Sequence, residues 1–157
     1  MKEKILEAFR ELGFKLEEEE GMGYCFNYEG LNLLYMYNEN DEEFLNIALP
    51  GIVEVEEDKM LQICALLEKI NSTLKYVKTY MLGNSVWLFY ERELFGEEDL
   101  MTVISRMILH LEAGLVFARK AMAEIEETMT NGSSDDDTTE SAEEIVTEEI
   151  ADDDNNE

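Results

Sequence analysis

The chain opens with apolar and charged residues interleaved at the spacing of an α-helix. Ile5, Leu6, Phe9 and Leu12 fall on one side of this helix, with charged residues between them. Gly13 follows directly and suits the left-handed position that ends many helices. The pattern therefore predicts an amphipathic first helix that stops just before Gly13.

Residues 22–37 alternate between apolar and small or polar side chains, as half-buried strands do. Glu29 and Gly30 fit a two-residue hairpin turn, because glycine tolerates a positive φ. If Tyr28 pairs with Leu31, the larger apolar residues of both strands share one face of the sheet. The segment is predicted to be a β-hairpin.

Three further features complete the middle of the chain. The acidic run 17–20 is expected to be a solvated connector. A third strand is expected around 45–49, where Pro50 and Gly51 would end it because proline cannot continue the hydrogen-bond ladder. Over 56–71 the apolar residues return to helical spacing, with acidic residues crowding the first turn, where the helix dipole favours them.

A second hairpin is predicted from strands at 75–82 and 85–91, with Gly83 and Asn84 as the turn. Antiparallel sheets usually keep one face wet, but this hairpin is apolar on both faces. One face would carry Val77, Met81, Val86, Leu88 and Tyr90. The other face would carry Tyr76, Tyr80, Leu82, Trp87 and Phe89. The second face should be covered by an extra element, a twin subunit or a bound segment.

The last predicted helix begins after Gly96 and runs to about Glu127. At 1.5 Å per residue it would span roughly 45 Å, longer than so small a domain is wide. Its apolar arc is also wider than one stripe. Excess apolar surface on both hairpin and helix favours a homodimer over a monomer. The expected partner or dimer interface consists of Tyr76, Tyr80, Leu82, Trp87, Phe89, Ile108, Val116 and Phe117.

The expected order is α-β-β-β-α-β-β-α, which predicts an α+β fold with an antiparallel sheet packed against helices. We expect one domain over residues 1–128 and a disordered acidic tail over 129–157, because the tail has little to bury. The 157-residue chain has a net charge of −26, and its first 130 residues alone carry −14. DNA, RNA and anionic membranes should repel such a protein, so neither nucleic acid nor membrane is an expected partner.

Cys25 and Cys64 lie in apolar patterns without CxxC spacing, which favours buried, reduced thiols over a disulfide. Glu3, Glu7 and Glu11 interrupt the apolar residues at the N-terminus, so this segment does not resemble a signal peptide. We expect the protein to be cytoplasmic.

No catalytic, metal or cofactor site is predicted. His110 is the only histidine, and with two cysteines the chain lacks the set of ligands that a zinc site needs. No nucleophile, base and orienting residue of a catalytic triad can be identified either. The acidic run 38–42 lacks the glycine and the final glutamate of a calcium loop, since Glu43 and Leu49 stand at those positions. No glycine-rich phosphate loop occurs. We therefore expect a protein that is not an enzyme and needs no cofactor.

An alternative function is a regulatory domain that binds a small ligand. The aromatic set Tyr24, Phe26, Tyr35 and Tyr37 could form one wall of such a pocket. The competing interpretation is that these rings belong to an ordinary core between sheet and helix.

Several short segments, placed on this element order, resemble the YbjN-like family of small bacterial proteins, which are similar in fold to type III secretion chaperones. They are Leu12-Gly13-Phe14, the hairpin Tyr24–Tyr37, the helix end Leu66–Asn71 and the strand Val86–Glu91. The resemblance covers about Met1–Glu127. It implies a dimer whose last strands and helix meet across a two-fold axis, and binding of protein segments in apolar grooves. We expect a chaperone-like or adaptor-like protein-interaction module that acts as a homodimer.

Overall fold

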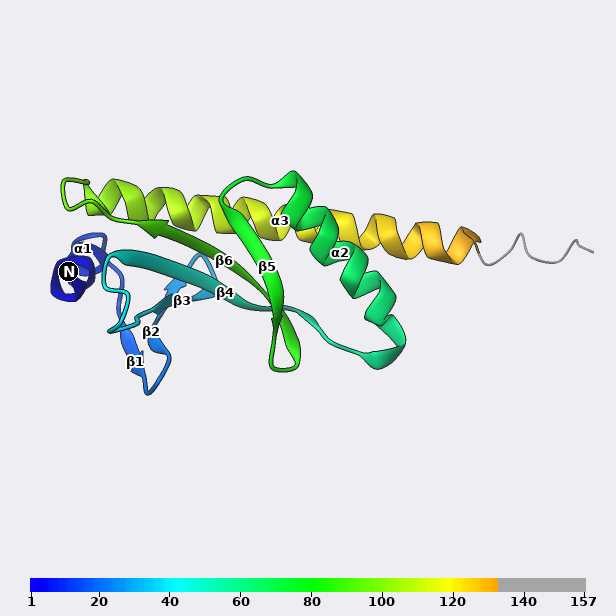
Figure 1. Cartoon of the computed structure of the whole chain (residues 1–157), viewed down its shortest axis with the longest axis horizontal. Helices are drawn as coiled ribbons and strands as arrows, with labels where there is room; N and C mark the ends of the chain where they lie inside the picture. Colours follow the sequence, from blue (N-terminus) through cyan, green and yellow to red (C-terminus); the bar gives the residue numbers. More distant parts are fainter. Residues whose placement is uncertain (133–157) are drawn as a thin grey trace, which may run out of the picture.

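A computed structural model gives the fold of residues 1–132, and residues 133–157, which hold most of the predicted acidic tail, lie outside the described residues. The described part contains three α-helices, one short 3-10 helix and six strands (Figure 1). In chain order they are α1 (Lys2–Glu11), β1 (Glu17–Glu19), β2 (Gly23–Tyr28), β3 (Leu31–Met36), β4 (Phe44–Glu54), η1 (Glu57–Lys59), α2 (Met60–Thr73), β5 (Val77–Leu82), β6 (Ser85–Glu93) and α3 (Leu100–Gly132).

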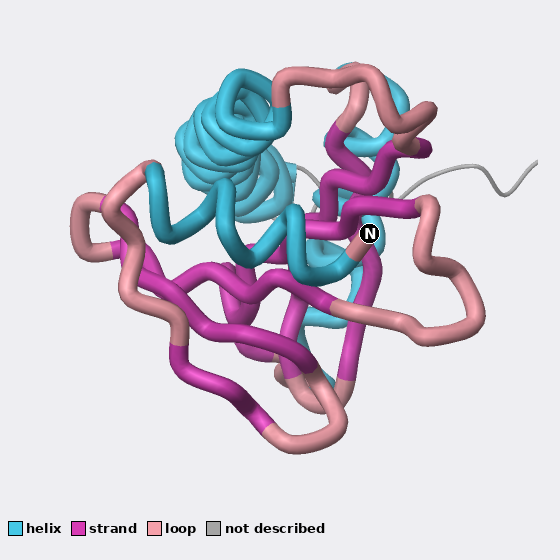
Figure 2. The backbone as a smooth tube through the Cα atoms, turned by 90° about the vertical axis from the view of Figure 1, so that its left-hand side faces the viewer, coloured by secondary structure: helices cyan, strands magenta, loops and turns pink. Residues whose placement is uncertain are grey.

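The six strands form one antiparallel sheet in the order β1-β2-β3-β4-β6-β5. Side chains from all three helices join one hydrophobic core on a single face of this sheet. Figure 2 shows α1 and α3 together on one side of the strands. This arrangement confirms the predicted α+β fold with helices packed on an antiparallel sheet.

The first helix ends as its sequence predicts. Gly13 has a φ of 88°, and its N–H donates to the carbonyl of Arg10 at 2.9 Å. The next N–H, from Phe14, donates to the carbonyl of Phe9 at 3.0 Å. This pair of bonds is a Schellman motif, which is often accompanied by an apolar contact between the two positions that Phe9 and Phe14 occupy here. The rings of Phe9 and Phe14 supply that contact, with centroids 6.1 Å apart.

Both predicted hairpin turns have the expected register. Tyr28 pairs with Leu31 across the first turn, and Leu82 pairs with Ser85 across the second. Successive residues of a strand point to opposite faces, so these two pairings fix the face of every residue in both hairpins. The face assignments made from the sequence therefore hold for the paired residues of β2, β3, β5 and β6.

Two strand predictions were wrong. The acidic run at 17–20 is not a plain connector, because Glu17–Glu19 pairs with β2 as a short edge strand. The third strand does not stop at Pro50. It continues to Glu54, and the ladder with β6 is irregular between Leu49 and Val53. The proline, which has no N–H to donate, lies inside this irregular stretch, where no ladder bond is required of it.

Asp99 begins the last helix. Its carboxylate accepts hydrogen bonds from the N–H groups of Met101 and Thr102, at 3.2 and 3.4 Å. Such a cap satisfies donors that have no partner within the first helical turn. The helix continues to Gly132, five residues beyond the predicted end, and spans about 50 Å. Its C-terminal part extends past the strands of the sheet (Figure 1).

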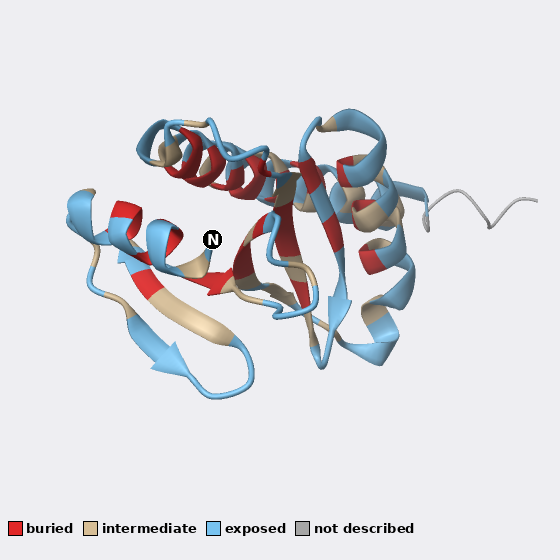
Figure 3. Ribbon diagram, turned by 60° about the vertical axis from the view of Figure 1, so that its left-hand side comes forward, coloured by how far each residue is buried: buried red, intermediate tan, exposed pale blue. Residues whose placement is uncertain are grey.

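The main core fills the space between the helices and the sheet. Its central side chains include Phe9, Tyr35, Ile47, Leu88 and Leu111, none more than 1% exposed. Figure 3 shows the buried positions gathered where the helices face the strands. A second, smaller apolar cluster lies on the other face of the sheet.

Candidate interaction surfaces

The face of the sheet opposite the helices is called here the open sheet face. Its centre is an apolar cluster formed by Leu34, Ala48 and Phe89, one residue from each of three neighbouring strands. Cys25, Met36 and Trp87 are half-buried around them. No helix within residues 1–132 contributes to this cluster. Leu34, Ala48 and Phe89 are at most 2% exposed, but the side chains around them are only partly buried, so a cover of additional apolar atoms would remove more surface from water.

Aromatic rings extend the cluster towards the edge strand β5. The ring of Tyr80 stacks on Phe89 with centroids 4.1 Å apart and planes 4° from parallel. Trp87 stacks on the same phenylalanine at 6.0 Å, and its indole N–H donates to the hydroxyl of Ser85 at 2.9 Å. Leu82 remains exposed at the end of the strand. Tyr80, Leu82 and Trp87 of the predicted interface thus lie together on the open sheet face, whereas Phe89, which was also predicted there, is 0% exposed beneath them.

The remaining positions of the open sheet face are strongly acidic. Paired residues of an antiparallel ladder share a face, so the registers assign each charge to one side of the sheet. The acidic residues on this face are Glu17, Glu19, Glu54, Glu91 and Glu93. Lys78 is the one basic residue there among the strand positions of residues 1–132, and its ammonium is paired with the carboxylate of Glu91.

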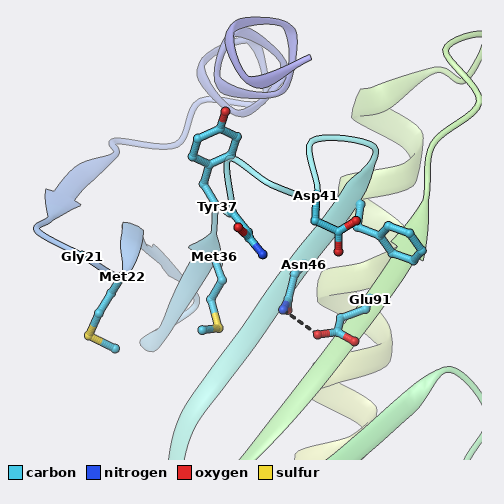
Figure 4. Close-up of a pocket in the computed structure, with 9 residues that line it drawn as sticks. Gly21, Met22, Met36, Tyr37, Asp41, Asn46 and Glu91 are labelled. Atoms are coloured by element: carbon cyan, nitrogen blue, oxygen red, sulfur yellow. Dashed lines mark hydrogen bonds between the residues drawn. The ribbon is translucent and has the colours of Figure 1, made fainter.

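A pocket of about 340 Å³ opens at the end of this face where β3, β4 and β6 meet the loop after β3 (Figure 4). Met22, Met36 and Phe44 form its apolar walls. Its polar lining includes Asp41 and Asn46. The amide nitrogen of Asn46 donates to Glu91 at 2.7 Å, but its buried oxygen has no hydrogen-bond partner among the described residues.

A second apolar surface lies along the outer side of α3. Leu109 is 51% exposed and Val116 is 64% exposed. Phe117 is half-buried against the core. Ile108, which the sequence analysis had grouped with these residues, is only 2% exposed and belongs to the core, because the arc of α3 that faces the sheet is wider than its predicted stripe. We therefore leave Ile108 out of the surface called here the outer α3 face.

Tyr76 does not lie on the open sheet face. It precedes β5 and has a φ of 69°, a backbone conformation that residues other than glycine rarely adopt. The side chain of Tyr76 therefore does not follow the alternation of the strand. Its ring stacks on Tyr90 at 5.7 Å and meets His110 of α3 edge-on at 5.4 Å. Tyr76 thus sits beside the outer α3 face, and the prediction that it shares a face with Trp87 was wrong.

His110 is engaged in this aromatic contact and in a hydrogen bond within its own helix. Its Nδ1 lies 2.7 Å from the carbonyl oxygen of Arg106. A ring nitrogen in that position donates when it carries the proton, which leaves Nε2 as the acceptor in the neutral ring. Residues 1–132 contain no group of three or more His, Cys, Asp or Glu side chains placed to hold a metal ion.

Of the four aromatic residues considered as a pocket wall, only Tyr37 lines the pocket at the end of the open sheet face. Phe26 and Tyr35 are buried, and both rings pack on Phe9 of α1 at 4.9 and 5.6 Å. Burial also raises the pKa of Tyr35 well above that of a free tyrosine. Tyr24 and Tyr37 lie at the margin under the ammonium of Lys2. These contacts favour the core interpretation of this aromatic set.

The two cysteines differ in environment. Cys25 is half-buried, and desolvation raises the pKa of its thiol, which favours the protonated form. Cys64 is exposed on α2, so the expectation that both thiols are buried was wrong for this residue. Both are free, as expected.

By length and composition alone, α3 would also qualify as a helix able to cross a membrane. Its sequence is interrupted by Arg106 and Glu112, and nine of its residues are buried within the chain. The apolar character of α3 is thus explained in large part by its role in the core.

Comparison with protein families finds no family that matches the chain, and comparison with curated proteins finds no matching sequence. Solved structures with a similar fold include the following two. YbjN of E. coli, for which a role as a transcription regulator has been suggested, superposes with a TM-score of 0.58 at 13% identity, over 75% of this chain and 90% of YbjN. An uncharacterised protein from Methanothermobacter thermautotrophicus superposes with a TM-score of 0.50 at 19% identity, over 81% and 97% of the two chains.

These likenesses show that the chain has the YbjN-like fold, as its element order and short segments predicted. At such low identity the likeness concerns the fold alone. The function has to be argued from the two surfaces.

Proposed function

From the YbjN-like fold and its two apolar surfaces, we propose that this protein is a non-enzymatic interaction module, chaperone-like or adaptor-like, that acts as a homodimer and binds protein segments. The observation that carries the proposal is the pair of separate surfaces. One lies on the outer α3 face and the other on the open sheet face, on opposite sides of the core.

Dimerisation is assigned to the outer α3 face. Leu109 and Val116 are two helical turns apart and flank Ala113, so they form a short apolar row on a long helix. A row of this kind can pair with its own copy around a two-fold axis, because the same patch serves both subunits. Tyr76 lies next to this row through its contact with His110 and would extend the interface.

Segment binding is assigned to the open sheet face. Tyr80 and Trp87 present rings there, both stacked on the buried Phe89, and aromatic anchors of this kind contribute much of the affinity at protein interfaces. The acidic residues around the rings oppose use of the same face for a dimer, since two copies would bring their glutamates together.

Several observations support a role without catalysis. The histidine is held by rings and a backbone carbonyl, and the thiol of Cys25 has a raised pKa. The transcriptional role suggested for YbjN would have to reach this chain through a protein partner, because its net charge of −26 opposes contact with DNA. The free cysteines are compatible with the proposed cytoplasmic location.

Light scattering after size-exclusion chromatography tests the dimer. The full chain has a mass of 18.2 kDa, and we expect the wild-type protein to elute with twice this mass at micromolar concentration. Val116→Glu should give the monomer mass, because it buries a charge at the two-fold contact without touching the core.

Leu61→Glu is the matched control. Leu61 is 70% exposed on α2, so the same chemical change occurs away from the proposed contact, and this variant should remain a dimer. A wild-type monomer, or a dimer that tolerates Val116→Glu, would contradict the assignment of dimerisation to the outer α3 face.

A further inference from the structure

The pocket at the end of the open sheet face has two hydrogen-bond acceptors without partners in the described part of the chain. Tyr37, whose hydroxyl donates to Glu42, and Asn38 also line it. The carboxylate of Asp41 is half-buried and makes no hydrogen bond or ion pair within residues 1–132, although it lines the pocket. The buried oxygen of Asn46 is a second acceptor without a partner in the described part of the chain. Glu91, beside it, is already bonded to Asn46 and Lys78. Unpaired acceptors beside a cavity favour a ligand that brings donors.

The walls of the same pocket are apolar and adaptable. Met22, Met36 and Phe44 line the pocket together with the acceptors, and Figure 4 labels the two methionines. Methionine side chains adjust their shape to what they contact. An aliphatic stem that ends in a positively charged donor matches both parts of this lining. Lysine and arginine side chains have that form, because their methylene stems pack on apolar surface while the charged head reaches polar groups.

The pocket continues into the rest of the open sheet face. Met36 belongs to the apolar cluster around Phe89, so the wall of the pocket and the apolar centre of the face share a residue. Five glutamates and one paired lysine set the charge of the face. A basic segment with apolar residues complements this surface in both respects, whereas a second copy of the chain or a nucleic acid does not.

We propose that the open sheet face binds a basic polypeptide segment, whose apolar side chains cover the cluster around Phe89 and whose lysine or arginine enters the pocket at Asp41. This assignment rests on the proposed function, and it names the chemistry of the partner. Asp41 serves as the acceptor for the charged head, Asn46 as a second acceptor, and Met22, Met36 and Phe44 as the walls for the stem.

The probe is a short fluorescein-labelled peptide in which lysine alternates with leucine and phenylalanine. A second peptide has glutamate in place of each lysine, and a third has serine in place of each apolar residue. Binding to the full chain is measured by fluorescence anisotropy at near-physiological ionic strength, where weak long-range attraction is screened. Trp87, the only tryptophan, reports on the open sheet face through its emission when the unlabelled peptides are added.

We expect the lysine peptide to bind best and to shift the emission of Trp87. Asp41→Asn should weaken its binding about threefold to tenfold, because the variant removes the charge from a charge-assisted hydrogen bond. The matched control is Asp58→Asn, which makes the same change at an exposed position of η1 outside the pocket and should have little effect.

Four results would overturn the inference. Equal weakening by Asp41→Asn and Asp58→Asn would mean that the whole acidic surface attracts the peptide, with no use of the pocket. Preference for the serine peptide would mean that charge alone acts. Tight binding of the glutamate peptide with a shift of Trp87 emission would remove the basic partner but leave the proposed segment-binding function standing. If no peptide binds and Trp87 does not respond, the segment-binding function fails as well.

Discussion

The side chain of Asn71 closes part of an exposed sheet edge, and its removal offers a quantitative test of the fold. β5 is the last strand of the sheet, so its outer backbone groups have no neighbouring strand. Asn71, near the end of α2, donates its amide N–H to the carbonyl of Thr79 at 3.0 Å. It also accepts from the N–H of Thr79 at 2.8 Å. The carboxamide thus takes the place of a peptide group from a missing strand.

The effect of Asn71→Ala can be worked out from these two bonds. Each hydrogen bond contributes about 0.5–1.5 kcal/mol to stability, so the pair contributes about 1–3 kcal/mol. Alanine has a helix propensity up to about 0.7 kcal/mol better than asparagine, which offsets part of that loss. With the full 0.7 kcal/mol subtracted, the net cost should be about 0.3–2.3 kcal/mol. Since Thr79 is 3% exposed, water can replace the lost partner only in part.

Two measurements check this value. Urea denaturation should give a lower free energy of unfolding for Asn71→Ala than for the wild type. The value for Asn71→Asp should lie between these two, because its carboxylate still accepts a hydrogen bond from the N–H of Thr79. Amide hydrogen exchange should show that the N–H of Thr79 loses protection selectively. If that N–H exchanges as slowly in Asn71→Ala as in the wild type, the side chain does not close the edge and the reasoning is refuted.

Three further predictions concern other parts of the fold. Gly23→Ala should lower the free energy of unfolding in urea by about 1–3 kcal/mol, because the added Cβ would lie 2.0 Å from the carbonyl oxygen of Tyr35. Gly21→Ala is the control and should lower it clearly less, because a Cβ there meets nothing within 4 Å. The pKa of Glu98 lies below its ordinary value of 4.5, chiefly because the N–H of Phe95 donates to its carboxylate. The ionised Glu98 therefore contributes its full stabilisation above pH 4.5, and this contribution is lost as the pH falls. The difference in free energy of unfolding between wild type and Glu98→Gln should accordingly disappear in acid. Lys69→Met should change stability by less than about 1 kcal/mol, since the Lys69–Glu124 pair is exposed, and a larger loss that persists in high salt would contradict this.

Much of the fold follows from local patterns in the sequence. The hairpin turns at Glu29-Gly30 and Gly83-Asn84 fix the register of four strands. Side chains of a strand alternate between the two faces of the sheet, so the register also determines the face on which each residue lies. The end of α1 at Gly13 follows from the need for a positive φ. These features depend on neighbours in sequence, which is why they can be predicted.

The errors arise where distant parts of the chain decide the outcome. The acidic segment Glu17–Glu19 becomes a strand only because β2 offers it an edge. Tyr76 leaves the strand pattern because Tyr90 and His110 hold its ring. Ile108 is buried because the sheet is broad enough to cover more of α3 than one stripe.

The candidate site was predicted in part. Tyr80, Leu82, Trp87 and Phe89 share the open sheet face, as the alternation of the second hairpin predicted. Of the residues that line the pocket at Asp41, only Tyr37 was named as a possible pocket wall from the sequence. The lining comes from residues between Gly21 and Glu91, and only the sheet topology brings them together.

The short edge strand β1 has a consequence for the behaviour of the protein in acid. All three of its residues are exposed glutamates, and charge on an edge strand prevents another sheet from adding to it. That protection disappears once the carboxylates are protonated, whereas the amide of Asn71 does not titrate and still closes part of the opposite edge. Acid should therefore open one end of the sheet selectively. We expect fibrils or strand-swapped oligomers formed at low pH to grow from β1, and purification steps near the isoelectric point of about 4.1 to carry this risk.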